Sequence, residues 1–142
     1  MKIFITGVAG FLGSHLADLM ISQGHTVAGN DNMIGGYTDN VPQDVEFHQV
    51  DCCDLENLTK AMEGCDVVYH TAATAYEGLS VFSPVLVTRN IFEASVTTIT
   101  AAIRNKVKRI VYCSSMARYG HHDEVPYKET YECRPQDPYG IA

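Results

Sequence analysis

Two serines and a tyrosine are the residues of this sequence best suited to acid–base chemistry. Ser114 and Ser115 follow a run of β-branched and aromatic residues, and Tyr139 lies near the C-terminal end. A tyrosine phenolate can remove a proton from a hydroxyl group while hydride leaves the same carbon, provided that its pKa falls from about 10 towards neutrality. A lysine one helical turn after Tyr139 would supply the necessary positive charge, and that position falls one residue beyond Ala142. Taken singly, the serines could merely end a strand, and the tyrosine could be an ordinary aromatic residue. They could carry out this chemistry only beside a group that accepts the hydride.

Three glycines with a spacing of three indicate a binding site for a cofactor that could accept hydride. Gly7, Gly10 and Gly13 follow the β-branched and aromatic residues 3–6, and an apolar pattern of helical period begins after them. A strand, a glycine turn and a helix N-terminus offer free backbone N–H groups and the positive end of the helix dipole to a pyrophosphate. The competing phosphate loop would end in Gly-Lys-Ser/Thr, which residues 13–15 do not provide. The pattern therefore predicts dinucleotide binding rather than a purely structural turn.

Two aspartates follow the next two expected strands. Asp31 stands about 20 residues beyond the last glycine, where a carboxylate accepts hydrogen bonds from the adenosine ribose and repels a 2′-phosphate. We therefore expect NAD rather than NADP, with Asp31 on the far side of the cleft from the glycines. The alternative for Asp31 is a solvated loop acid. Asp51 could reach the adenine edge, and a role as a helix-capping or surface acid is nearly as compatible with its position.

The elements that must position these residues alternate between strand and helix. Apolar residues at Leu12, Leu16, Leu19 and Met20 predict a helix that ends at Gly24. A second helix is predicted between Asp54, as its N-cap, and the glycine at position 64. Strands are predicted over residues 3–6, 26–30, 45–50, 66–70 and 108–114, with a last helix beginning near position 138. This order predicts an α/β fold of the Rossmann type, a doubly wound parallel sheet of about five strands in one domain over residues 1–142.

The segment 85–106 is ambiguous. Residues 96–100 are all β-branched and on propensity alone would form a strand. However, Val87, Ile91, Ala94 and Thr98 keep a helical period, and Pro84 suits a helix start. We predict a helix, because a strand here would break the alternation.

Composition excludes several classes of partner. The net charge of −7 disfavours nucleic acid and anionic membranes, and no apolar run approaches the length of a membrane span. The five cysteines have neither zinc-site nor Cys-x-x-Cys spacing. We expect reduced thiols, no metal, no nucleic-acid or membrane partner, and a cytoplasmic protein.

Several motifs together resemble the extended short-chain dehydrogenase/reductase family, and in particular its nucleotide-sugar epimerases. The stretches that carry the resemblance are Thr6–Gly13, Asp31–Asn32, Asp51, His70–Ala73, Asn90, Ser114–Gly120 and Arg134–Ala142.

The resemblance implies a role for individual residues. Ser115 and Tyr139 would be catalytic: Tyr139 would deprotonate a sugar hydroxyl, Ser115 would hydrogen-bond the same oxygen, and the keto-sugar would turn over before hydride returns to its opposite face. NAD would be the cofactor, held by Gly7, Gly10, Phe11, Leu12, Gly13, Asp31, Asn32, Asp51, Cys52, Thr71, Ala72, Ala73, Asn90 and Tyr139.

The residues after Ser115 help to choose a reaction. Sugar dehydratases resemble one another in an Asp-Glu pair here, and decarboxylating relatives in a Ser-Glu pair, whereas this chain has Met116-Ala117. Epimerisation of a nucleotide sugar is therefore favoured over dehydration or reduction, and a non-catalytic NAD-binding module is the rival from another class. Family members resemble one another in running to roughly twice this length. We therefore expect the C-terminal substrate domain to be absent, the fragment to be inactive alone, and the full-length protein to be a homodimer.

Overall fold

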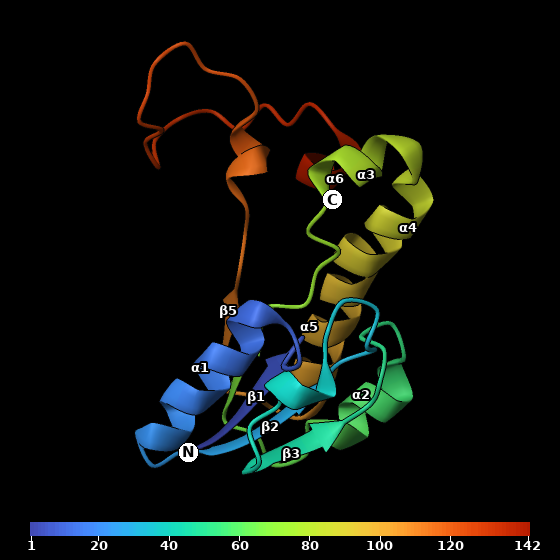
Figure 1. Cartoon of the computed structure of the whole chain (residues 1–142), viewed down its shortest axis with the longest axis vertical. Helices are drawn as coiled ribbons and strands as arrows, with labels where there is room; N and C mark the ends of the chain where they lie inside the picture. Colours follow the sequence, from blue (N-terminus) through green and yellow to red (C-terminus); the bar gives the residue numbers. More distant parts are fainter.

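The computed structural model, which describes residues 1–142, contains one parallel sheet with the strand order β3-β2-β1-β4-β5 (Figure 1). The strands are β1 (Lys2–Thr6), β2 (Thr26–Asn30), β3 (Val45–His48), β4 (Val67–His70) and β5 (Arg109–Tyr112). Every neighbouring pair is parallel, so all five carboxyl ends lie at one edge of the sheet. The order reverses beside β1, because β2 and β3 lie on one side of it and β4 and β5 on the other. Ligands of open α/β sheets bind at such a switch point.

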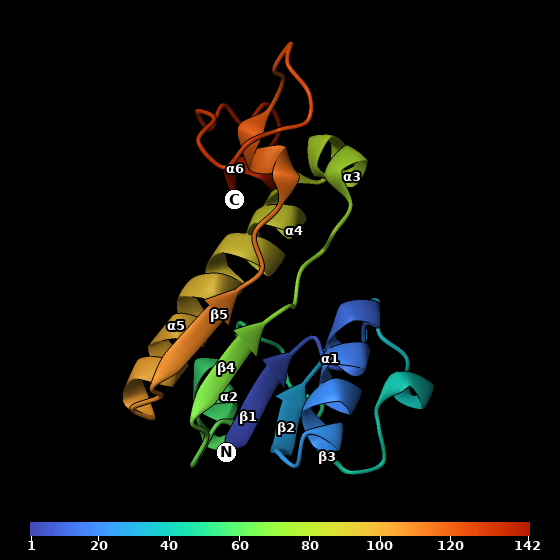
Figure 2. The same ribbon diagram turned by 90° about the vertical axis from the view of Figure 1, so that its left-hand side faces the viewer.

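Helices cover both faces of the sheet (Figure 2). Helix α1 (Phe11–Ser22) packs on one face, where Ala17 and Met20 join Ile3, Ile5 and other strand residues in one buried cluster. Helices α2 (Leu55–Ala61) and α5 (Ala94–Arg104) pack on the other face around Phe4. Ile3 and Ile5 therefore point to one face of the sheet and Phe4 to the other. All three are buried, as expected for a central strand of a parallel sheet. None of the helices combines the length and apolar character needed to cross a bilayer.

The predicted architecture is confirmed, and the ambiguous segment 85–106 is helical. It begins with α4 (Pro84–Thr88), continues through the π-helical segment η2 (Arg89–Glu93) and ends as α5. Burial explains why helix overrides propensity here, since Thr98, Ala101 and Ala102 face the core and anchor the helix to the sheet. Neither η2 nor the short helix α3 (Glu77–Phe82) was predicted.

The ends of the elements differ modestly from those predicted. Strand β3 ends at His48, two residues early, and β5 is shorter at both ends. Asp54 caps α2 as predicted, because its carboxylate accepts the N–H of Asn57 at 3.2 Å. Three short helices lie outside this alternation of strands and longer helices. They are η1 (Thr38–Asn40), between β2 and β3, and η3 (Met116–Tyr119) and α6 (Pro138–Ile141), both after β5.

The chain between η3 and α6 forms a long loop that projects away from the sheet, orange in Figure 1. Aromatic side chains hold it together: His122 lies with its ring centroid 4.9 Å from that of Tyr131 and 5.7 Å from that of Tyr127. Arg134 N–H closes the loop by donating to the carbonyl of Tyr119 at 3.3 Å. Below this loop, β5 pairs only with β4, so its other edge is unpaired.

Replacing Gly13 with alanine should strongly destabilise the protein. A Cβ atom at Gly13 would lie 2.1 Å from the carbonyl oxygen of Gly7 and 2.9 Å from the Cα of Val8, and backbone atoms cannot turn aside. We expect the free energy of unfolding to fall by about 3 kcal/mol, measured by urea unfolding followed by circular dichroism. Gly78→Ala is the control, because nothing lies within 4 Å of that position in α3 and alanine favours a helix. Equal stability of the two variants would contradict the close packing of Gly13 against the backbone of Gly7 and Val8.

Candidate dinucleotide and active site

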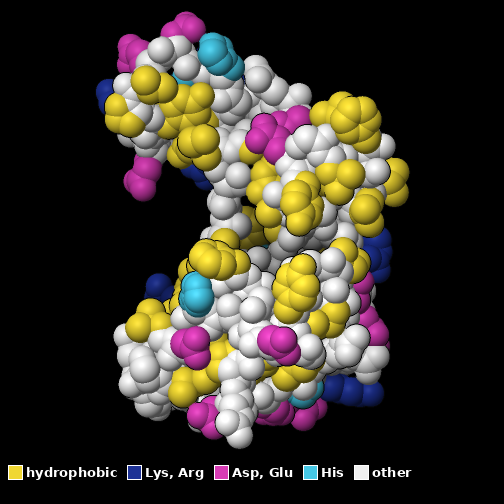
Figure 3. Space-filling view, in the orientation of Figure 1, with side chains coloured by type: hydrophobic (Ala, Val, Ile, Leu, Met, Phe, Trp, Pro, Cys, Tyr) yellow, Lys and Arg dark blue, Asp and Glu magenta, His cyan; other side chains and the backbone are white.

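A cleft of about 510 Å³ lies at the carboxyl edge of the sheet. The glycine turn, the segments that follow β2, β3 and β4, and the helix segment containing Asn90 and Ala94 line it. Figure 3 shows the molecular surface deeply indented between the helix-covered sheet below and the C-terminal segment above. The volume lies within the range of sites for small molecules and cofactors.

The structure brings together all fourteen residues predicted to hold the cofactor, since each of them lines this cleft. The sequence reasoning missed Asn30, Ile34, Tyr76 and Ala94, which line it too. No lysine or arginine lines the cleft, whereas Asp31 and Asp51 do. A pyrophosphate here would therefore depend on backbone N–H groups and the dipole of α1.

The glycine turn can present its backbone because neighbouring chain packs directly on it. Gly7 adopts a φ of 71°, and a Cβ atom there would lie 2.9 Å from the Cα of Ala72. Gly10 is the N-cap of α1, and no side chain caps this end of the helix. The first N–H groups of α1 thus remain available to an anion. These observations fit the bound phosphates of a dinucleotide.

Asp31 lies against the glycine turn rather than on the far side of the cleft, which corrects the expectation from the sequence. Its Oδ2 atom accepts the N–H of Ala9 at 3.1 Å, and its Oδ1 atom accepts the N–H of Met33 at 2.8 Å. The residue is 8% exposed, so it is not the solvated loop acid of the alternative interpretation. Each carboxylate oxygen can accept a further hydrogen bond, which leaves capacity for a ribose hydroxyl.

Asp51 is held by three donors from different segments. Its Oδ1 atom accepts the N–H of Cys53 at 2.8 Å, and its Oδ2 atom accepts from Asn32 Nδ2 at 3.4 Å and Arg89 Nη1 at 3.2 Å. Burial opposes ionisation, but these hydrogen bonds outweigh it and hold the pKa of Asp51 below its ordinary value. Since Asp54 caps α2, the helix-capping role is not the one that Asp51 fills.

A buried chain of hydrogen bonds joins the strands beside the cleft to the helix above it. Thr6 Oγ1 accepts the N–H groups of Thr71 and Ala72, each at 3.2 Å, and lies 2.7 Å from His70 Nδ1. His70 Nε2 lies 3.0 Å from Ser95 Oγ, which donates to the carbonyl of Ile91. These partners assign the proton of His70 to Nε2, because Ser95 Oγ uses its own hydrogen on Ile91.

His70 is neutral in this arrangement. It is 3% exposed, and burial lowers its pKa from 6.5 to about 4. The sequence placed His70 beside the cofactor segment by resemblance only, and no spacing rule could reveal its partners on β1 and α5.

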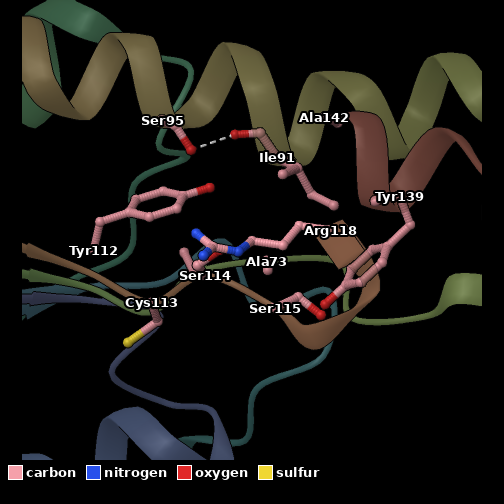
Figure 4. A pocket seen from close by; sticks show the side chains of 12 residues that line it. Ala73, Ile91, Ser95, Tyr112, Cys113, Ser114, Ser115, Arg118, Tyr139 and Ala142 are labelled. Carbon is pink, nitrogen blue, oxygen red and sulfur yellow. Dashed lines mark hydrogen bonds between the residues drawn. The ribbon is translucent and has the colours of Figure 1, made fainter. Parts of the chain in front are cut away.

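The two predicted catalytic residues line a smaller pocket of about 70 Å³ (Figure 4). Tyr139 reaches from α6 towards Ser115, which is the N-cap of η3 and accepts the N–H of Ala117 at 3.2 Å. Gly140 permits this approach, because a Cβ atom there would lie 2.8 Å from the carbonyl oxygen of Ala117. The pocket opens into the cleft, since both are lined by Ala72, Ala73, Cys113, Ser114 and Tyr139.

Two further residues of this pocket were missed by the sequence reasoning. Tyr112, at the end of β5, points towards Ser95 in Figure 4, and Arg118 brings a cation to the pocket. Arg118 Nη2 donates to the hydroxyl of Tyr119 at 2.8 Å. Its place within the motif of residues 114–120 was a signal that could have revealed it.

A parallel sheet with a glycine turn and a carboxylate at the switch point defines a dinucleotide-binding protein, and comparison with known proteins narrows this class. Residues 3–142 match the NAD dependent epimerase/dehydratase family. The chain therefore belongs to this family, and its cofactor is NAD, as predicted. The roles of the individual residues remain predictions.

The similar proteins include several nucleotide-sugar epimerases. Over 99% of its length the chain is 32% identical to a probable UDP-arabinose 4-epimerase of Arabidopsis thaliana and 32% identical to a UDP-glucose 4-epimerase of Streptomyces lividans, covering 37% and 44% of those proteins. Among solved structures, the UDP-glucose 4-epimerase of Thermotoga maritima with UDP-glucose has a TM-score of 0.94 at 31% identity, with 99% of this chain and 47% of that one covered. That of Thermus thermophilus with NAD has a TM-score of 0.93 at 33% identity, with the same coverage. The chain thus spans less than half the length of these relatives.

The buried state of His70 predicts an acid-dependent loss of stability. Because unfolded His70 binds a proton near pH 6.5 and the folded form only near pH 4, stability is undiminished above pH 6.5 and falls as the pH drops towards 4. The full loss is about 3 kcal/mol. In His70→Gln the urea midpoint should therefore change less between pH 7 and pH 4.5 than in the unmodified protein.

The exposed His121 provides the control, and His121→Gln should keep the original pH dependence. An unchanged pH dependence in His70→Gln would show that His70 does not resist protonation in the folded protein.

Proposed function

We propose that the protein containing this chain is an NAD-dependent epimerase of nucleotide sugars, and that it inverts a sugar carbon by transient oxidation to a ketone. The observation that carries the proposal is the continuity of the two cavities: the pocket with Ser115 and Tyr139 shares five lining residues with the dinucleotide cleft. The relatives that match 99% of the chain are named as UDP-sugar 4-epimerases, which favours a UDP-sugar and its fourth carbon.

The residues of the pocket divide the chemistry between them. NAD, when bound, supplies a reversible hydride acceptor next to the sugar. The Tyr139 phenolate removes the proton of the sugar hydroxyl and later returns it, while Ser115 donates a hydrogen bond to the same oxygen. A positive charge beside Tyr139 would assist this proton transfer, and the family resemblance implies a lysine one helical turn beyond it for this purpose. Arg118 lines the same pocket and adds positive charge.

The glycine turn and the two aspartates would hold the cofactor. Gly7, Gly10 and Gly13 leave room for the pyrophosphate, Asp31 accepts the ribose hydroxyls, and Asp51 faces the adenine. We further propose that residues 1–142 form the cofactor half of the enzyme and do not turn over substrate alone. The sugar and its nucleotide would be held chiefly by residues outside this chain.

A second copy of the chain is the proposed partner. The apolar side chains of Val85, Phe92, Val96, Ile99 and Ile103 are 40–82% exposed along the helix from α4 to α5. Their spacings of three, four and seven are those of a helix–helix seam. A net charge of −7 argues against nucleic-acid and anionic-membrane partners, and we place the proposed homodimer in the cytoplasm.

Asp31 should set the preference between the two nicotinamide cofactors. We expect calorimetry to show tighter binding of NAD than of NADP, because the Asp31 carboxylate repels a 2′-phosphate. In Asp31→Asn, which keeps an acceptor for Ala9, the ratio of the two dissociation constants should shift towards NADP by about tenfold. Asp44→Asn, at an exposed position that does not line the cleft, should leave the ratio unchanged. Equal affinities of the unmodified protein for NAD and NADP would show that Asp31 does not select between the two cofactors.

Ser115 and Tyr139 should control turnover in the protein that contains this chain. Incubated with UDP-glucose and NAD, it should form the 4-epimer without net NADH, as followed by proton NMR and absorbance at 340 nm. Ser115→Ala and Tyr139→Phe should each lower kcat by about 10²–10⁴-fold. Tyr37→Phe is the matched control, since this tyrosine is 72% exposed.

The other outcomes of that experiment separate the alternatives. Stoichiometric NADH would indicate a dehydrogenase. NAD binding without any turnover would favour a non-catalytic module.

A further inference from the structure

The helix from α4 to α5 passes the cleft through its π-helical segment η2. Two side chains bind carbonyl groups of this segment: Cys53 Sγ donates to Arg89 O at 3.5 Å, and Ser95 Oγ donates to Ile91 O. Asn90, between these two positions, lines the cleft. The segment is therefore attached on one side to the residues after β3 and on the other side to the buried chain through His70.

Arg89 connects Asn90 to the adenosine side of the cleft. Its Nη1 atom lies 3.2 Å from Asp51 Oδ2 and 3.3 Å from Asn90 Oδ1. Arg89 is not itself among the lining residues. Its influence on a ligand is therefore exerted through its charge and through these two neighbours, not through the cleft lining.

The contacts continue on both sides of Arg89 as a chain of side chains. Asn32 Nδ2 donates to Asp51 Oδ2 at 3.4 Å, and Asn90 Nδ2 donates to Thr74 Oγ1 at 2.9 Å. The polar chain thus runs from the loop after β2, past the end of β3 and through η2, to the segment after β4. The Asn90 amide has a defined orientation in it, because its oxygen faces a donor and its nitrogen faces an acceptor. Without the guanidinium, the Oδ1 atom of Asn90 loses its donor.

Arg89 also supplies charge that the cleft lacks. The lining contains two carboxylates and no cation, and a dinucleotide would add two phosphate groups. The Arg89 guanidinium, which is 44% exposed and outside the cleft lining, partly balances the negative charge of Asp51. Asp51 in turn raises the pKa of Arg89, so the pair stays ionised over the ordinary pH range.

We infer that Arg89 is a positioning residue, which couples occupation of the adenosine end of the cleft to the placement of Asn90 nearer the reacting end. The inference rests on the proposed binding of NAD by this cleft. Arg89 orients the Asp51 carboxylate and fixes the Asn90 amide with the same Nη1 group, so the two ends share one donor.

Calorimetry of Arg89→Met with two ligands tests this coupling in the protein that contains the chain. NAD spans both ends of the cleft, whereas AMP occupies only the adenosine end. We expect the dissociation constant to rise about tenfold for NAD and about threefold for AMP. Arg104→Met is the matched control: Arg104 pairs with Glu56 at 2.8 Å, lies on the same helix and is 45% exposed. Its affinities should stay within about twofold of the original.

Arg89→Lys separates positioning from charge. A lysine keeps the cation beside Asp51 but lacks the planar guanidinium. AMP binding should therefore be retained and NAD binding weakened. In a double-mutant cycle, Asn90→Ala should cost less NAD affinity in the Arg89→Met background than alone.

Three results would overturn the inference: NAD affinity of Arg89→Met equal to that of Arg104→Met, equal losses of AMP and NAD affinity in Arg89→Lys, or additive effects of Arg89→Met and Asn90→Ala. Failure of the unmodified protein to bind NAD is distinguishable from these, because it would remove the proposed function as well.

Discussion

The contact on which the site depends is the one between the carboxyl ends of β1 and β4. Thr6 accepts two N–H groups from the chain after β4, and Gly7 packs against the backbone of Ala72 with no room for a side chain. Because His70 extends this contact to Ser95, the glycine turn, the segment 71–75 and the helix above them form one hydrogen-bonded unit. A buried network of this kind is costly when any member loses its partner, so it fixes the relative positions of three elements at once.

The two ends of the cleft stabilise negative charge in different ways. At the glycine turn, backbone dipoles replace side-chain cations, and Asp31 accepts hydrogen bonds from the N–H groups of Ala9 and Met33. At the other end, Asp51 relies on the guanidinium of Arg89. The lining is thus free of flexible cations. Fixed dipoles need little reorganisation when an anion binds, whereas a flexible lysine would first have to be ordered.

The sequence predicted those parts of the fold that local chemistry decides. The strand, glycine turn and helix around residues 3–22, the capping by Asp54 and the helical period after Pro84 all depend on neighbours in the chain. The family resemblance further named fourteen residues that prove to line one cleft, and those that follow β1 to β4 meet there because parallel strands bring their carboxyl ends together. The π-helical segment, the pairing of Arg89 with Asp51 and the contact of Asp31 with Ala9 were not predicted. The two contacts join residues 22 and 38 positions apart, and no periodicity encodes such contacts.

Because helix α6 is short, the region around Tyr139 has a lower local stability than the glycine turn. Four residues cannot form a stable helix alone, so Tyr139 keeps its place through the Asp137 cap and the close packing of Gly140 on η3. Ser115 lies in the same region as α6, whereas the glycine turn directly follows β1, whose residues 3–6 are at most 1% exposed. Local unfolding would therefore separate the tyrosine from the serine while the glycine turn remains folded. Separation of Tyr139 from Ser115 and unfolding of the glycine turn are then two distinct events, with different free energies, in one small domain.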